Sequence, residues 1–120
     1  MRYMLLLYGE EGLDPAPDSA EMQKMMDAYA AFSQEVQERG VFRSGEPLQS
    51  VTTATTVRVR DGDSLVTDGP FAETKETLGG FYILDCKDLD EAIEFAAKVP
   101  AALTGSVEIR PIMEFDQPAS

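Results

Sequence analysis

A carboxylate beside a tight turn is the first residue in this sequence that could do chemistry. Asp68 follows the predicted return strand of a hairpin at residues 64–67 and precedes Gly69-Pro70-Phe71, so a predicted strand ends in a turn there. A side chain at such a junction is held by a rigid scaffold and still reaches solvent, which suits a general base or an orienting group. The same carboxylate can instead accept hydrogen bonds from nearby backbone amides and hold the turn together. The two roles can coexist.

Charged residues directly after this turn are candidates for binding a ligand. Lys75 lies between Glu73 and Glu76, and a lysine between carboxylates can hold an anionic group or act as a base when it is desolvated. A solvated cluster of surface charges is the alternative interpretation.

Arg43 and Glu46 flank Gly45 near the end of a short predicted strand, and we expect both near the same cleft. The guanidinium fork of Arg43 can bind two oxygens of a carboxylate or phosphate, although an internal salt bridge explains this residue equally well. We therefore take Asp68 as the candidate catalytic residue and Arg43, Glu46, Lys75 and Glu76 as candidate ligand-binding residues.

Composition removes several classes of function. The chain has 120 residues, 22 acidic against 10 basic, and a net charge of -12, so nucleic acid and anionic lipid surfaces are not expected partners. It has no histidine and one cysteine, which excludes an intrachain disulfide and indicates no metal site or cofactor. The first apolar run, residues 3–8, is too short for a signal peptide or a membrane span, so we expect a cytoplasmic protein.

Alternating and helical patterns predict the elements that must position these residues. A buried strand is expected over residues 3–8, followed by a Gly- and Pro-rich loop over 10–17 that suits a mobile lid. Asp18 and Glu21 have the spacing of a capping box, and Gly40 supplies a stop, so a helix is expected between them. Its apolar stripe consists of Met25, Met26, Tyr29, Phe32 and Val36.

The sequence of the second half of the chain predicts several strands, one helix and a final strand. The sequence predicts a short strand over 41–44 broken at 45–47, a hairpin of 56–60 with 64–67, a strand over 81–86, a helix capped by Asp88 that ends by Pro100, and a strand over 107–110. Residues 116–120 are expected to form a polar tail.

Two amphipathic helices can cover one face of a sheet of four or five strands, which predicts a single α+β domain. Residues 3, 5 and 7 point to one face of the first strand and residues 4, 6 and 8 to the other, and both sets are apolar. An uncovered apolar face is rare on a soluble monomer. We therefore expect a homodimer whose sheets pack face to face, with a cleft near the interface.

Residues 66–76, VTDGPFAETKE, resemble the signature of the DGPF group of YCII-related proteins. Segments similar to the same group occur in the same order over nearly the whole chain: RYMLLLY at 2–8, GEPL at 45–48, ATTVR at 54–58, GGF at 79–81 and GSVEIRP at 105–111. The resemblance assigns residues 1–115 to one YCII-related (DGPF) domain. It implies a ferredoxin-like fold that forms a dimeric α/β barrel, and it implies little about activity.

Two functions are expected from these observations. The first is a small-molecule-binding protein or enzyme that uses a cleft at the dimer interface. YCII-type relatives are suspected to be enzymes because an aspartate and a histidine meet in that cleft, but this chain has no histidine, so acid–base chemistry would fall to carboxylates, lysine, tyrosine or the thiol. The second is a non-catalytic regulatory or interaction module, such as a partner of a sigma factor, since some DGPF proteins are encoded beside alternative sigma factors.

Overall fold

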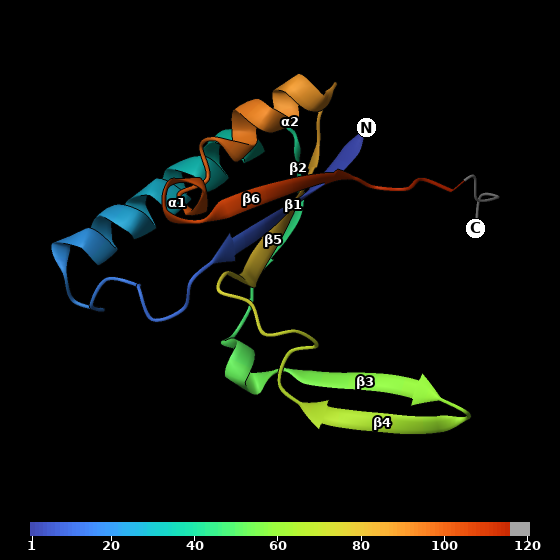
Figure 1. The fold of residues 1–120 in the computed structure, drawn as a ribbon. Coiled ribbons are helices and arrows are strands. Elements are labelled where there is room, and N and C mark those ends of the chain that lie inside the picture. Colours follow the sequence, from blue (N-terminus) through green and yellow to red (C-terminus); the bar gives the residue numbers. More distant parts are fainter. Residues whose placement is uncertain (116–120) are drawn as a thin grey trace.

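The computed structural model describes residues 1–115 as one four-stranded sheet, helices on one of its faces, and a separate hairpin (Figure 1). The predicted tail at 116–120 lies outside the described residues. In chain order the elements are β1 (Arg2–Gly9), α1 (Ala20–Glu38), β2 (Phe42–Pro47), the 3-10 turn η1 (Val51–Thr53), β3 (Thr55–Arg60), β4 (Asp63–Asp68), β5 (Thr77–Asp85), α2 (Leu89–Ala96), α3 (Ala101–Thr104) and β6 (Ser106–Pro111).

The main sheet has the strand order β2-β5-β1-β6, with every neighbouring pair antiparallel. With the hairpin set aside, the chain order is β-α-β-β-α-β, and the two central strands are the first and third of these. This is the arrangement of a ferredoxin-like fold, so the predicted α+β class is confirmed. Among residues 1–115, no helix combines the length and apolar character that crossing a bilayer requires.

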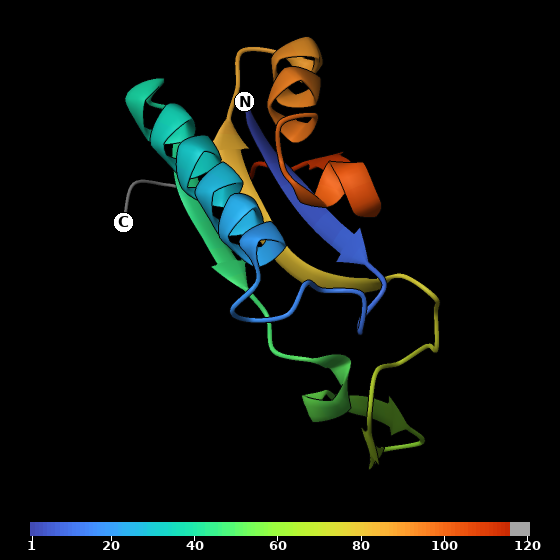
Figure 2. The same ribbon diagram turned by 90° about the vertical axis from the view of Figure 1, so that its left-hand side faces the viewer.

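The core lies between the helices and one face of the sheet. Alternation in β1 buries Tyr3, Leu5 and Leu7, as their spacing predicts. The largest side chains that are fully buried are Phe95, Leu5, Leu84, Val36, Val99 and Cys86. The opposite face of the sheet is formed by Met4, Leu6, Tyr8, Phe81 and Ile83, which are only partly buried. We call these five residues the open face, because α1, α2 and α3 all lie on the other side (Figures 1 and 2).

Helix α1 begins one residue later than the capping box predicts. The N-cap is Ser19, whose Oγ accepts a hydrogen bond from the Met22 amide at 3.1 Å. Asp18 therefore does not cap the helix. The predicted stop is confirmed, because Gly40 follows with φ of 72°, a left-handed conformation that glycine adopts readily. Met26, expected in the apolar stripe, is exposed.

Strand β2 continues through Gly45-Glu46-Pro47, where the sequence predicts a break. Pro47 has no backbone N–H to donate. It is tolerated here because β2 is an edge strand and Pro47 lies at its end, whereas a central strand would need that hydrogen bond. Gly45 is required there, since a Cβ would meet the ring of Tyr82 across the pair. The short helix α3 directly after Pro100 is a further element that the sequence pattern does not predict.

The predicted hairpin is present, but it forms a two-stranded sheet of its own. Its strands pair from Thr55 with Asp68 to Arg60 with Asp63, around a turn in which both Asp61 and Gly62 have positive φ. Every hairpin residue except Thr56 is exposed. In Figure 1 the hairpin extends from one end of the main sheet, away from the helices.

Candidate functional site

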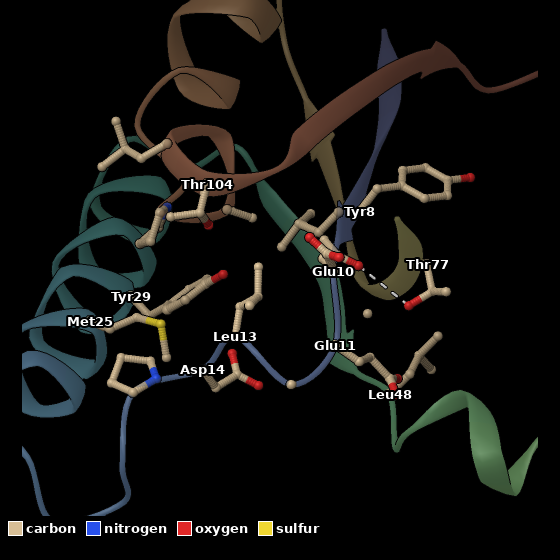
Figure 3. Close-up of a pocket in the computed structure, with 18 of the residues that line it drawn as sticks. Tyr8, Glu10, Glu11, Leu13, Asp14, Met25, Tyr29, Leu48, Thr77 and Thr104 are labelled. Atoms are coloured by element: carbon tan, nitrogen blue, oxygen red, sulfur yellow. Dashed lines mark hydrogen bonds between the residues drawn. The ribbon is translucent and has the colours of Figure 1, made fainter. Parts of the chain in front are cut away.

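A partly open cavity of about 1030 Å³ lies at the end of the sheet where β1 finishes. Its walls come from the loop after β1, the first half of α1, helix α3, and the segments beside β2 and β5 (Figure 3). The apolar and aromatic lining residues include Leu7, Tyr8, Leu13, Met25, Tyr29, Leu48 and Leu103. The charged ones are Glu10, Glu11, Asp14 and Lys24.

Tyr29 brings a hydroxyl into this cavity from the middle of α1. The side chain is half-buried, and in Figure 3 it points across the cavity toward Leu13. Burial raises the pKa of Tyr29 above its usual value, nearby Tyr82 adds to the rise, the Ala101 amide opposes it, and Asp14 contributes a further, smaller rise. The hydroxyl therefore keeps its proton at neutral pH and can donate a hydrogen bond to a bound molecule.

The loop between β1 and α1 forms one side of the cavity and is tied to the far wall by Glu11. The Glu11 carboxylate accepts hydrogen bonds from Ser50 Oγ at 2.8 Å and from the Val51 amide at 2.9 Å. These bonds connect the loop to the start of η1, where the chain leaves β2 for the hairpin. The loop expected to be a lid is therefore held against the cavity by one side chain.

A second, smaller hollow of about 240 Å³ lies at the base of the hairpin. Gly69, Pro70, Glu73 and Thr74 line it, together with Thr77, which also lines the larger cavity. The Thr77 hydroxyl donates to the Gly9 carbonyl at 3.4 Å, the contact drawn in Figure 3. The turn at residues 68–71 and the large cavity therefore lie on either side of Thr77.

Asp68, the candidate catalytic residue, is the exposed last residue of β4, opposite Thr55. Its carboxylate accepts no hydrogen bond from the residues that the structure describes. The turn is held instead by the Gly69 amide, which donates to the Ala54 carbonyl at 2.7 Å, and by the Thr56 hydroxyl, which donates to the Gly69 carbonyl at 2.8 Å. Asp68 does not line either hollow.

The structure does not bring the other predicted residues together. Arg43 lies at the opposite end of the sheet from the cavity, where its guanidinium donates to two backbone carbonyls and pairs with Asp85 at 3.3 Å. The ion pair with Asp85 agrees with the second interpretation of Arg43 from the sequence, that of a partner in an internal salt bridge. Glu46 lies beside Phe81 at the edge of the open face, and Lys75 is exposed. Glu76 accepts a hydrogen bond from Ser106 Oγ at 2.9 Å.

The sequence reasoning missed the residues that line the large cavity. The sequence predicts a lid over residues 10–17 but indicates no role for its carboxylates, and it predicts Tyr29 only as part of the apolar stripe of the helix. A usable signal is the position of Tyr29 in the middle of α1, the helix that follows a loop rich in acidic residues. Within residues 1–115, no three acidic or sulfur side chains cluster as metal ligands would.

Comparison with known proteins places this chain in a family. The family model of the YCII-related domain matches residues 1–116. The chain belongs to the YCII-related family. The uncharacterized protein R00369 of Rhizobium meliloti (strain 1021) is 40% identical to it over 114 residues, which cover 93% of this chain and 92% of that protein.

The fold of this YCII-related protein is also found in a solved enzyme structure. It is the 5-chloro-2-hydroxyhydroquinone dehydrochlorinase of Burkholderia phenoliruptrix AC1100 in complex with 2,5-dihydroxybenzoquinone. The two structures superpose with a TM-score of 0.52 at 16% sequence identity, and the match covers 96% of each chain. At this identity the likeness concerns the fold alone.

Proposed function

We propose that this YCII-related protein binds a small organic molecule in the cavity between the 9–15 loop, α1 and α3. The observation that carries the proposal is the cavity itself, whose volume of about 1030 Å³ is at the upper end of the range typical of ligand sites. Its lining combines apolar walls with a few hydroxyl and charged groups, as ligand sites do. The dehydrochlorinase of the same fold was solved with a quinone bound, which supports small-molecule binding in this architecture.

The charges around the cavity favour a neutral or positively charged ligand. Three carboxylates, Glu10, Glu11 and Asp14, line it against one ammonium group, that of Lys24. An anion entering the cavity would meet net negative charge, both locally and from a chain of net charge -12. Tyr29 offers a hydrogen bond and an aromatic face, which suits a ligand with a ring or an amine.

The homodimer expected from the sequence remains part of the proposal. The open face is apolar on both central strands, and pairing two open faces would bury it and produce a dimeric α/β barrel. Tyr8 belongs to the open face and also lines the cavity. A second copy stacked on the open face would therefore sit beside the cavity mouth, where the interface cleft is expected.

An open cavity favours ligand binding over the regulatory alternative. A protein-interaction module needs no hollow of this size, and its cleft would be expected to be filled by side chains.

A ligand screen with a cavity-filling variant tests the proposal. Ala28 lines the cavity, whereas Ala30, two residues along the same helix, does not. Neutral and cationic ring compounds are screened by thermal shift, since a ligand that binds only the folded state raises Tm. We expect a compound that raises the Tm of the wild type and of Ala30→Trp but not of Ala28→Trp. Equal shifts in all three proteins, or hits confined to anions, would contradict the proposal.

A further inference from the structure

The β3–β4 hairpin carries an apolar surface that nothing in its own chain covers. Val57 pairs with Val66 and Val59 with Ser64, so the three valines share one face. Their side chains are 60%, 61% and 64% exposed. We call Val57, Val59 and Val66 the valine face. A two-stranded hairpin is only marginally stable in water without a packing partner, so this face is expected to be covered in the working protein.

The dimensions of the chain agree with a hairpin that serves as an arm. The radius of gyration is 16.9 Å, whereas about 14 Å is expected for a compact chain of this length. The hairpin contributes to this excess, because its strands pair only with each other and it projects away from the main sheet (Figure 1).

The hairpin projects from the main sheet on the side away from the helices (Figures 1 and 2). In Figure 1 the helices lie on one side of the main sheet and the hairpin extends to the other. In Figure 2, seen from the helix side, the hairpin lies below the main sheet and is fainter, so it extends away from the helix side. The hairpin therefore stands out on the same side as the open face, and a second copy that is seated on the open face and extends past the end of the sheet would meet it.

We infer that the hairpin is an arm that clasps a second copy of this chain, with its valine face packed against the margin of that copy's open face. The inference rests on the open-face dimer in the proposed function. Within one chain the valine face and the open face do not meet, because the hairpin projects outward from the end of the sheet. A two-fold pair lets the hairpin of each copy cover the other copy, so that both apolar surfaces are buried at once.

Two arginines of the hairpin and two glutamates at the margin of the open face carry opposite charges. Arg58 and Arg60 on the hairpin form no ion pair with any residue in the described part of the chain. Glu46 and Glu108 lie at opposite edges of the open face and are exposed. Arg58 and Arg60 lie on the face of the hairpin opposite the valine face, and their long side chains can extend past the edge of the hairpin toward such carboxylates. These pairs would offset part of the repulsion between two chains that each carry a net charge of -12.

Dimer dissociation measured by light scattering and analytical ultracentrifugation tests the arm. The variant carries Val57→Ser, Val59→Ser and Val66→Ser. The control carries Leu65→Ser and Thr67→Ser, which lie on the opposite face of the same hairpin. We expect the valine variant to dissociate at a concentration at least about tenfold higher than the wild type, since each valine removed from an interface loses buried apolar area. The control is expected to dissociate like the wild type.

A proximity measurement separates direct packing from a hairpin that merely loses its structure. A spin label is placed at Asp63→Cys, near the tip of the hairpin, in a chain without isotope, and this chain is mixed with ¹⁵N-labelled wild type. We expect broadening of amide signals of the labelled chain at Glu46 or Glu108 and their neighbours. If the wild type is a dimer but shows no such broadening, and the valine variant dissociates like the wild type, the hairpin does not contact the second copy. That result would overturn the arm but not the open-face dimer. A wild-type monomer at all concentrations would overturn both, and the cavity would still be tested by Ala28→Trp.

Discussion

Asp68 ends β4 directly before the turn at Gly69, and its side chain is exposed. The sequence places it at the junction of a strand and a turn, and the structure has it there. Its two possible roles differ in what the carboxylate contacts, and such contacts depend on which other segments reach the turn. Here the Thr56 hydroxyl, from the neighbouring strand, makes the hydrogen bond that holds Gly69, and periodicity does not reveal a pair of this kind.

Exchange of Asp68 for asparagine is therefore expected to leave stability almost unchanged. The side chain is exposed and accepts no hydrogen bond within residues 1–115, so the free energy of unfolding should change by less than about 0.5 kcal/mol. Thr56→Val removes the hydrogen bond to Gly69 and should cost about 1 kcal/mol. Urea denaturation of both variants measures the two changes. A loss of stability in Asp68→Asn that matches Thr56→Val would show that Asp68 holds the turn after all.

Cys86 is the only thiol in the chain, and burial shapes its chemistry. The side chain is 1% exposed, and burial, helped by the charges of Glu91 and Asp85, raises its pKa to about 11. Between the ordinary thiol pKa near 9.0 and this value, the unfolded chain releases the proton and the folded chain keeps it. Stability is therefore expected to fall as pH rises from about 9 toward 11.

Labelling kinetics give the matching measurement for Cys86. At pH 8 the thiolate fraction in the folded protein should be about 100-fold lower than in the unfolded chain, because the pKa differs by about two units. Burial slows reagent access further. We expect a thiol reagent to modify Cys86 in urea and at least about 100-fold more slowly in buffer. Equal rates in the two solutions would mean that this strand end is open in the native state.

At the scale of elements, the sequence predicts β1, α1, the hairpin, α2 and β6 well, because each carries a long periodic pattern or a strong turn signal. The predictions are wrong where a short turn-forming sequence is overridden by pairing or packing with a distant segment. The sequence suggests that Gly45-Glu46-Pro47 ends β2, yet pairing with β5 carries the strand through it. The sequence does not predict the cavity, because its walls come from the loop after β1, from α1 and from α3. The pattern of one segment does not show which other segments pack beside it.

The start of α1 offers a direct comparison of two adjacent caps. Ser19 accepts the hydrogen bond from Met22, so Ser19→Ala should destabilise the protein by about 1 kcal/mol. Asp18→Ala, one residue earlier, should change the free energy of unfolding by less than about 0.5 kcal/mol. Thermal or urea unfolding of the two variants measures the difference. The reverse order would place the N-cap at Asp18, as the capping-box spacing suggests.

At the scale of the whole molecule, three surfaces of the chain are proposed to contact other molecules: the cavity, the open face and the valine face. The sequence predicts the open face from alternation in β1 and β5, since residues 4, 6, 81 and 83 are apolar on the side away from the helices. It predicts the hairpin but not its separation from the main sheet. That separation depends on the connections at 48–54 and 69–76, whose path is set by contacts such as Glu11 with Ser50.

Binding of a small molecule in the cavity is tested most directly by NMR of the methionine methyl groups. Met25 lines the cavity, whereas its neighbour Met26 is exposed elsewhere on α1. With methyl-labelled protein and a neutral or cationic ring compound from the thermal screen, we expect the Met25 signal to shift saturably while that of Met26 stays in place. A saturable shift confined to Met4, on the open face, or to no methionine at all, would contradict binding in this cavity.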